Sequence, residues 1–216
     1  MQSLPLVTVI CLSYNHEKFV EEALNSVLQQ SYPNVELIVI DDCSTDNSKK
    51  TIEKWLKNNP EIQFIANEKN LGNTKTFNKA VCYAKGEYII DLAADDYLLE
   101  YCIETQIKTF KNSSFKNLGI VYGNIIQVDE NDVFIKNYYT ESDYPKSGNI
   151  YEIVISRSSK ICSVGSMVKK EVLEAVGYYN ENLAYEDLDL WIRVSRVFEF
   201  EYIPKILAKK RETPTN

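Results

Sequence analysis

A single histidine and the lack of any CxxC pair narrow the chemistry open to this chain. His16 follows an apolar run, and we expect it to be a hydrogen-bonding loop residue rather than a catalytic one. The cysteines are Cys11, Cys43, Cys82, Cys102 and Cys162. They lie mostly in apolar segments, where we expect reduced structural thiols, as is typical of cytosolic proteins.

Long apolar runs and concentrations of positive charge are also missing. No apolar run is long enough for a membrane span, and residues 1–5 show no signal-peptide pattern. We therefore expect a cytoplasmic protein with at most peripheral contact at the inner face of the membrane. The 24 Lys and Arg residues are spread along the chain against 31 Asp and Glu, for a net charge of −7. A nucleic-acid binder normally shows a basic stripe, so the spread of charge disfavours that class.

The length of the chain fits one domain. With 216 residues and 44% hydrophobic content, there is enough to bury one core and hardly enough for two. No internal repeat or linker divides the sequence. We expect a single domain over residues 1–216, with a regular half at 1–112 and a more irregular half at 113–216.

Buried strands that end in carboxylates are the most informative pattern. Residues 35–43, VELIVIDDC, form an apolar run that breaks into Asp41 and Asp42, and residues 87–96 lead in the same way to Asp95 and Asp96. A continuous apolar run predicts a buried parallel strand, and ligands bind at the carboxyl edge of such sheets. Two acidic strand ends favour a metal-bridged polyphosphate or a sugar nucleotide, so the pattern predicts a nucleotide-handling α/β enzyme.

The order of the other elements supports this fold class. A strand at residues 6–12 and a helix at 19–30 precede the strand that ends at Asp42, which makes a right-handed βαβ unit. After residue 112, the pattern predicts antiparallel strands at 119–129 and 133–139 and a long loop at 140–162. A helix at 187–197, a closing strand at 198–207 and a frayed tail at 209–216 complete the prediction.

Five motifs, in the right order and spacing, resemble those of the inverting GT-A glycosyltransferases of family 2. They are Val9-Ile10-Cys11-Leu12-Ser13-Tyr14-Asn15, Val39-Ile40-Asp41-Asp42-Cys43-Ser44-Thr45-Asp46, Asn70-Leu71-Gly72, Gly86-Glu87-Tyr88-Ile89 through Asp95-Asp96, and Glu186-Asp187-Leu188-Asp189-Leu190-Trp191. The resemblance covers nearly the whole chain. It implies a GT-A (Rossmann-like) mixed sheet, mostly parallel and flanked by helices. Residues 1–112 would bind the nucleotide-sugar, and the more irregular antiparallel half at 113–216 would bind the acceptor.

The resemblance also implies which residues bind the donor. Leu12, Ser13 and Tyr14 correspond to the first strand end that contacts the nucleotide. Asp41 or Asp42 would hydrogen-bond the base or the ribose, and a carboxylate that accepts from the uracil N3–H favours a UDP-sugar. The alternative for this acid pair is a structural role at a helix N-terminus.

The loop at residues 70–72 is the second part of the implied donor site. Asn70 and Gly72 resemble the family's loop that allows backbone to approach the base. A plain turn explains the same two residues nearly as well.

One carboxylate is implied as a metal ligand. Asp95 stands where the family has the last acid of its Asp-x-Asp motif, which holds Mg²⁺ or Mn²⁺ against the diphosphate. Ala93 replaces the first acid of that motif, and Asp91 on the same strand is expected to lie too deep to substitute for it. This departure lowers the expected metal affinity.

Glu186 and Asp187 resemble the family's catalytic acid pair. Inversion at the anomeric carbon needs one general base to deprotonate the acceptor hydroxyl, and we assign that role to Asp187, with Glu186 orienting the acceptor or the base. The alternative is a pair of acids stabilised by the helix dipole.

The predicted function is transfer of a sugar from a nucleotide donor to an oligosaccharide or lipid-linked glycan in cell-surface polysaccharide assembly. Ala93 keeps open an inactive, glycosyltransferase-like nucleotide-binding module. A receiver-like regulatory domain would also explain Ile40-Asp41-Asp42, but that fold is shorter and has no long antiparallel half.

Overall fold

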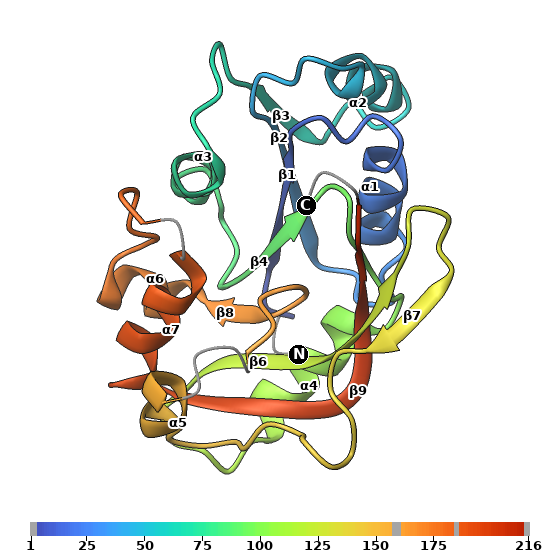
Figure 1. The fold of residues 1–216 in the computed structure, drawn as a ribbon. Helices are drawn as coiled ribbons and strands as arrows, with labels where there is room; N and C mark the ends of the chain where they lie inside the picture. The colour runs from blue at the N-terminus through green and yellow to red at the C-terminus, as the bar shows by residue number, and fades with distance from the viewer. Residues whose placement is uncertain (1–3, 157–160, 184–185, 214–216) are drawn as a thin grey trace.

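One curled sheet organises the chain in the computed structural model, which describes residues 4–156, 161–183 and 186–213 (Figure 1). The strands are β1 (Val7–Ser13), β2 (Val35–Asp41), β3 (Gln63–Ala66), β4 (Tyr88–Ala93), β5 (Tyr97–Leu98), β6 (Leu118–Val128), β7 (Phe134–Asn137), β8 (Met167–Lys169) and β9 (Glu199–Arg211). Over the described residues their order is β3-β2-β1-β4-β8-β6-β9-β5, with β7 paired to β6.

Helices cover both faces of the sheet. They are α1 (Val20–Leu28), α2 (Ser48–Leu56), α3 (Asn73–Val81), α4 (Cys102–Asn112), α5 (Tyr151–Ser156), α6 (Lys170–Val176) and α7 (Glu186–Ser195). In the first half of the chain, α1 and α2 lie on one side of the parallel strands and α3 lies on the other (Figure 1). This α/β architecture with a mixed sheet confirms the predicted fold class.

The four strands β3, β2, β1 and β4 are parallel and in continuous register. The apolar runs explain them, because all seven residues of β1 are buried, as expected for a strand covered on both faces. Helix α1 closes one face through Val20, Ala23, Leu24 and Val27, which recur at helical spacing and are all buried. The predicted βαβ unit is confirmed, and it places the ends of β1, β2 and β4 at one edge.

The second half adds both antiparallel and parallel pairs. Strand β8 is antiparallel to β4 and β6, and β6 forms the predicted antiparallel hairpin with β7. The longest pairing, of β6 with β9, is parallel. It extends from the pair Leu118 and Glu199 to the pair Val128 and Arg211. A Cβ at Gly123 would lie 2.5 Å from Leu207, so a glycine allows the close approach of these two strands.

Two predictions for the second half were wrong. Residues 140–162 are not a continuous loop, because α5 forms over Tyr151–Ser156 and buries Val154; residues 157–160 lie outside the described part. The tail predicted at 209–216 is strand through Arg211, since β9 stays paired with β6 to that residue and Glu212 N donates to Val128 O. Residues 214–216 lie outside the described part.

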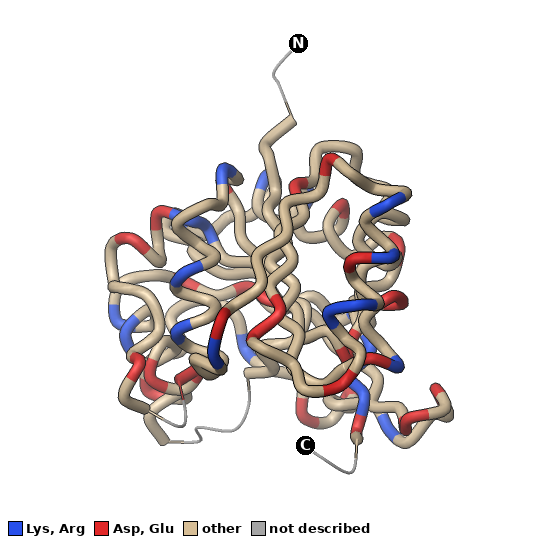
Figure 2. The backbone as a smooth tube through the Cα atoms, turned by 90° about the horizontal axis from the view of Figure 1, so that it is seen from above, with Lys and Arg blue, Asp and Glu red and all other residues tan. Residues whose placement is uncertain are grey.

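The distribution of charge can be followed along the backbone. Lysines and arginines are interspersed with aspartates and glutamates around the molecule (Figure 2). Among the described helices, none combines the length and the apolar character needed to cross a bilayer.

Candidate active site

A cavity of about 720 Å³ opens at the carboxyl ends of β1 and β4. Most of the residues predicted from sequence line it, namely Leu12, Ser13, Tyr14, Asp42, Asn70, Gly72, Asp95 and Glu186. The other described lining residues are Asn15, His16, Asn73, Thr76, Ala93, Asp96, Val164 and Lys210. Two predicted residues, Asp41 and Asp187, are not among the described lining residues. The fold therefore gathers the predicted residues of five separate sequence segments around one space.

Asp42 holds the loop that forms one wall of the cavity. Its Oδ1 accepts hydrogen bonds from Asn67 Nδ2 at 2.7 Å and from Leu71 N at 2.9 Å, and its Oδ2 accepts from Gly72 N at 2.8 Å. Asn70 Oδ1 also accepts from Gly72 N, at 2.9 Å. Gly72 has φ +82°, a conformation that favours glycine. The carboxylate of Asp42, directly after β2, thus fixes this loop. A plain turn would not require these contacts.

Asp41 is buried below the cavity and shapes the turn that follows β2. Its Oδ2 accepts from Ser44 N at 3.0 Å, and Cys43 between them adopts a positive φ of 62°. A residue at 1% exposure offers little surface to a ligand. Of the two acids left open by the sequence, Asp42 is the one that faces the cavity.

Asp95 and Asp96 form a buried acidic pair beyond the end of β4. Burial, followed by the charge of Asp95, raises the pKa of the Asp96 carboxyl to about 8. The backbone N–H of Arg211, which donates to Asp96 Oδ1 at 2.8 Å, opposes this rise. Burial and the neighbouring Asp95 therefore favour the protonated form of the Asp96 carboxyl.

Arg211 supports this pair from the far end of the chain. Its Nη1 donates to the Asp95 carbonyl at 2.7 Å, its Nη2 donates to Glu22 Oε2 at 2.8 Å, and its Cζ lies 4.6 Å from the centre of the Phe19 ring. Sequence reasoning missed Arg211, as it missed Lys210, because both fell in the predicted tail. The apolar run before them, continued as strand, was the signal that could have found them.

The metal expectation can be tested on the same residues. No group of three or more His, Cys, Asp or Glu side chains is arranged to hold an ion in the described ranges. Asp95 is only 4% exposed and lines the cavity, while Ala93 contributes no ligand atom. Mg²⁺ and Mn²⁺ accept one or two carboxylates when phosphate oxygens and waters complete the shell. Asp95 fits a metal shared with a diphosphate, and a metal held by protein ligands alone has no support.

Asp91 does not take the place of the missing acid. It is not among the described lining residues, and its Oδ2 accepts from the Tyr179 hydroxyl at 3.2 Å. Burial raises the pKa of the Asp91 carboxyl to about 7, which the Tyr179 hydrogen bond partly opposes. The expectation that this side chain lies too deep to reach the site agrees with these contacts.

The acid pair at the start of α7 is divided between two environments. Glu186 lines the cavity, and its Oε1 accepts from Asn73 Nδ2 at 3.0 Å, which links the first residues of α7 and α3. Asp187 is not among the described lining residues, and its Oδ1 accepts from Leu188 N at 2.7 Å. Its charge is one cause of the raised pKa of Tyr138, about 12, after burial and Cys162. The N-terminus of a helix stabilises both carboxylates. Of the pair, Glu186 is the residue that lines the cavity.

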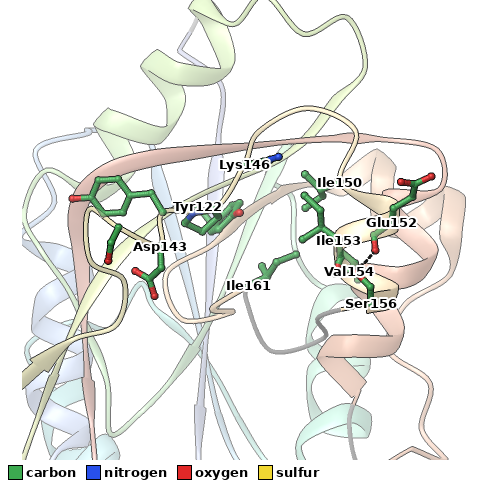
Figure 3. A pocket seen from close by; sticks show the side chains of 12 residues that line it. Tyr122, Asp143, Lys146, Ile150, Glu152, Ile153, Val154, Ser156 and Ile161 are labelled. Atoms are coloured by element: carbon green, nitrogen blue, oxygen red, sulfur yellow. Dashed lines mark hydrogen bonds between the residues drawn. The ribbon is translucent and has the colours of Figure 1, made fainter.

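A second cavity of about 490 Å³ lies in the second half of the chain (Figure 3). Tyr122 and Tyr144 line it with Lys146 and Glu152, and the cavity extends to Ile161. Tyr144 also packs against Tyr202 at a ring-centre distance of 5.3 Å. None of the described residues that line the donor-side cavity lines this one, so the two spaces are separate.

Comparisons with known proteins agree on the family. The model of "Glycosyl transferase family 2" matches residues 8–177. "Uncharacterized glycosyltransferase MJ1057" of Methanocaldococcus jannaschii is 30% identical over 210 residues, which cover 96% of this chain and 71% of the relative. Chondroitin synthase of Escherichia coli is 28% identical over 95% of this chain and 29% of its own length. The chain thus spans well under a third of that relative.

Solved structures share the fold. Residues 1–349 of S. aureus TarS in complex with UDP superpose with a TM-score of 0.76 at 21% identity, covering 97% of this chain and 61% of that one. The mannosyltransferase PcManGT from Pyrobaculum calidifontis, solved with GDP-Man and Mn²⁺, gives a TM-score of 0.70 at 20% identity, with 97% and 57% coverage. These structures show the fold, and the family model together with the MJ1057 relative shows the family. The chain belongs to glycosyltransferase family 2, and it is a glycosyltransferase.

Proposed function

We propose that this domain transfers a sugar from a UDP-sugar to a glycan acceptor, with inversion at the anomeric carbon. The observation that carries the proposal is the cavity that brings Asp42, Asp95 and Glu186 together from three distant segments. Chondroitin synthase among the relatives supports polysaccharide assembly as the setting. Because the chain spans only part of most of these relatives, the acceptor and the whole protein's activity belong to the proposal.

Asp42 is the proposed base-recognition residue. Each carboxylate oxygen has more than one lone pair, so Asp42 can hold the 70–72 loop and still accept from the N3–H of uracil. Tyr14 and Asn70 line the cavity beside it. TarS was solved with UDP and PcManGT with GDP-Man, so the fold accommodates either base. The acceptor carboxylate at Asp42 favours uracil.

Asp95 is the proposed main protein ligand of a divalent cation that binds together with the diphosphate. PcManGT was solved with Mn²⁺, which supports the same class of cation here. When bound, the cation would neutralise the charge that develops on the leaving nucleoside diphosphate. Arg211 donates to the Asp95 carbonyl, and this contact fixes the backbone of Asp95 beside the cavity.

Asp187 is the proposed general base, and Glu186 positions the acceptor. A carboxylate at the start of α7, on the acceptor side of the donor cavity, can take the proton of an incoming hydroxyl during in-line attack. Glu186 is anchored by Asn73 and lies on the cavity wall. We place further sugar rings of an oligosaccharide or lipid-linked acceptor in the second cavity (Figure 3). The exposed ring of Tyr144, which lines this cavity, offers aromatic surface to them.

The five cysteines support a cytoplasmic setting for the reaction. All are free thiols in the structure, and Cys11, Cys102 and Cys162 are buried. Contact with the inner face of the membrane, through a lipid-linked acceptor, would be peripheral.

Calorimetric titration with UDP and with GDP, each with Mn²⁺ and with EDTA, tests the donor assignment. We expect UDP to bind in the presence of Mn²⁺ and to raise the melting temperature, because a ligand of the folded state stabilises it. Binding of GDP but not UDP would refute the base assignment.

Turnover separates the enzyme from an inactive binding module. We expect slow donor hydrolysis that depends on Mn²⁺ and an inverted product by NMR. Binding of UDP without any hydrolysis or transfer would favour the module that Ala93 keeps open, and a retained anomeric configuration would refute the single-base mechanism.

A further inference from the structure

Lys210 is the only lysine or arginine among the described residues that line the donor cavity. It lies in β9 opposite Gln127 of β6, between Lys209 and Arg211. Both neighbours have partners of their own. Lys209 Nζ donates to Asp132 Oδ2 at 2.8 Å, and the Arg211 guanidinium donates to the Asp95 carbonyl and to Glu22. Because side chains alternate along a strand, Lys210 points away from its two neighbours and into the cavity.

The charge of the cavity makes this position significant. The carboxylates of Asp42, Asp95 and Glu186 line the same space, and Ala93 contributes no charge and no metal ligand. A diphosphate that enters such a site meets like charges, so it needs cationic partners to bind. One carboxylate-bound dication and the Lys210 ammonium are the partners that the described lining offers.

The ion pair that Lys210 forms does not occupy its N–H groups. Its Nζ lies 3.6 Å from Glu212 Oε1, a distance too long for a hydrogen bond. Glu212 in turn is fixed by a hydrogen bond from the side-chain amide of Gln127. Lys210 lines the same cavity as Asp95 and Asp96, and its charge opposes the rise in the pKa of the Asp96 carboxyl. An ammonium has three N–H donors, and these remain available to a ligand.

We propose that Lys210 is a donor-binding residue whose ammonium contacts the diphosphate of the nucleotide-sugar and supplies part of the positive charge that the site lacks at Ala93. The inference rests on the proposed nucleotide-sugar function. It adds a residue from the C-terminal strand to a site otherwise built from strand ends of the first half and the start of α7.

Calorimetric titrations of the wild type, Lys210→Met, Lys210→Arg and Lys209→Met with UDP and with uridine test the proposal. A charge-assisted hydrogen bond to phosphate corresponds to about ten-fold or more in affinity. We expect Lys210→Met to weaken UDP by at least about ten-fold while uridine, which lacks phosphate, binds unchanged. Lys210→Arg should recover most of the loss, and the loss should be larger in EDTA than in Mn²⁺.

Lys209→Met is the matched control, because it removes the same charge from the adjacent residue on the opposite face of β9. Its UDP affinity should stay close to that of the wild type. Equal losses for the two variants would overturn the proposal, and so would equal losses of UDP and uridine in Lys210→Met. If the wild type binds UDP and Lys210→Met binds it as well, only the Lys210 inference fails. If the wild type binds neither UDP nor GDP, the proposed function fails with it.

Discussion

Replacing Arg211 by methionine should destabilise the whole domain, although the residue lies close to the end of the chain. Arg211 is only 2% exposed. Its guanidinium satisfies the Asp95 carbonyl at 2.7 Å and lies 4.6 Å from the centre of the Phe19 ring. Methionine would keep apolar contact with Phe19 and lose every polar contact of the guanidinium. The substitution therefore isolates the polar contribution of the side chain.

The expected loss can be worked from these contacts. A buried carbonyl left without its donor costs about 1–3 kcal/mol, and a desolvated cation–π contact is worth about 2 kcal/mol. The ion pair with Glu22 adds about 0–1 kcal/mol, because half of the Glu22 side chain is exposed. Since these terms are not additive and methionine repacks, we expect about 3 kcal/mol. For a domain of this size that lowers the melting temperature by about 6–12 °C.

Thermal and urea unfolding of the wild type, Arg211→Met and Arg196→Met provide the measurement. Arg196 is an exposed arginine that contacts Tyr151, so it controls for the loss of one positive charge and one aromatic contact. Arg211→Lys keeps the charge without the planar fork and should fall between the two. A melting temperature for Arg211→Met within about 2 °C of the Arg196 control would show that the buried contacts contribute little, and the reasoning would be wrong.

Three other substitutions test separate parts of the structure. Asp187→Asn should lower the transfer rate by about 10²–10⁴ with UDP affinity unchanged; a rate above about a tenth of wild type in a direct transfer assay would exclude this base. Asp91 holds its proton in the folded state up to pH about 7 but releases it near pH 4 when unfolded, so its stabilising contribution is complete below pH 4 and is lost as the pH rises through 7. Between pH 5 and pH 8, the free energy of unfolding measured in urea should fall by about 2 kcal/mol more in the wild type than in Asp91→Asn. An equal fall in the two proteins would contradict the assignment. Gly86→Ala would place a Cβ 2.5 Å from Thr8 N and should cost about 1–3 kcal/mol in the same assay, whereas unchanged stability would show that the backbone there yields.

The strand ends of the nucleotide half were predictable because their signals are local. A continuous apolar run and the acids that follow it are neighbours in the chain, and the parallel geometry of a βαβ unit brings such ends to one edge. The sequence thus located Asp42, Asp95 and the loop at Asn70 and Gly72, and all four line the cavity. The pattern could not separate Asp41 from Asp42, because adjacent residues in a strand point to opposite faces. Which one faces the ligand depends on how the strand packs.

The antiparallel half was less predictable because its segments are short and its pairings are long-range. The helix α5 has six residues, too few to show a helical period, so its segment was interpreted as loop. The parallel pairing of β9 with β6 joins residues about eighty positions apart, and no local pattern reports on such a partner.

The sequence by itself determined the fold class, the family and the acids at the strand ends, since each is encoded in short contiguous patterns. Only the tertiary structure decided that the last strand completes the site. Arg211 reaches the Asp95 carbonyl across 116 positions, and Lys210 lines the cavity, because the pairing of β9 with β6 brings the end of β9 beside the Asp95-Asp96 turn. That pairing results from packing over the whole sheet, so charged residues at the end of the chain look like a solvated tail until the sheet is assembled.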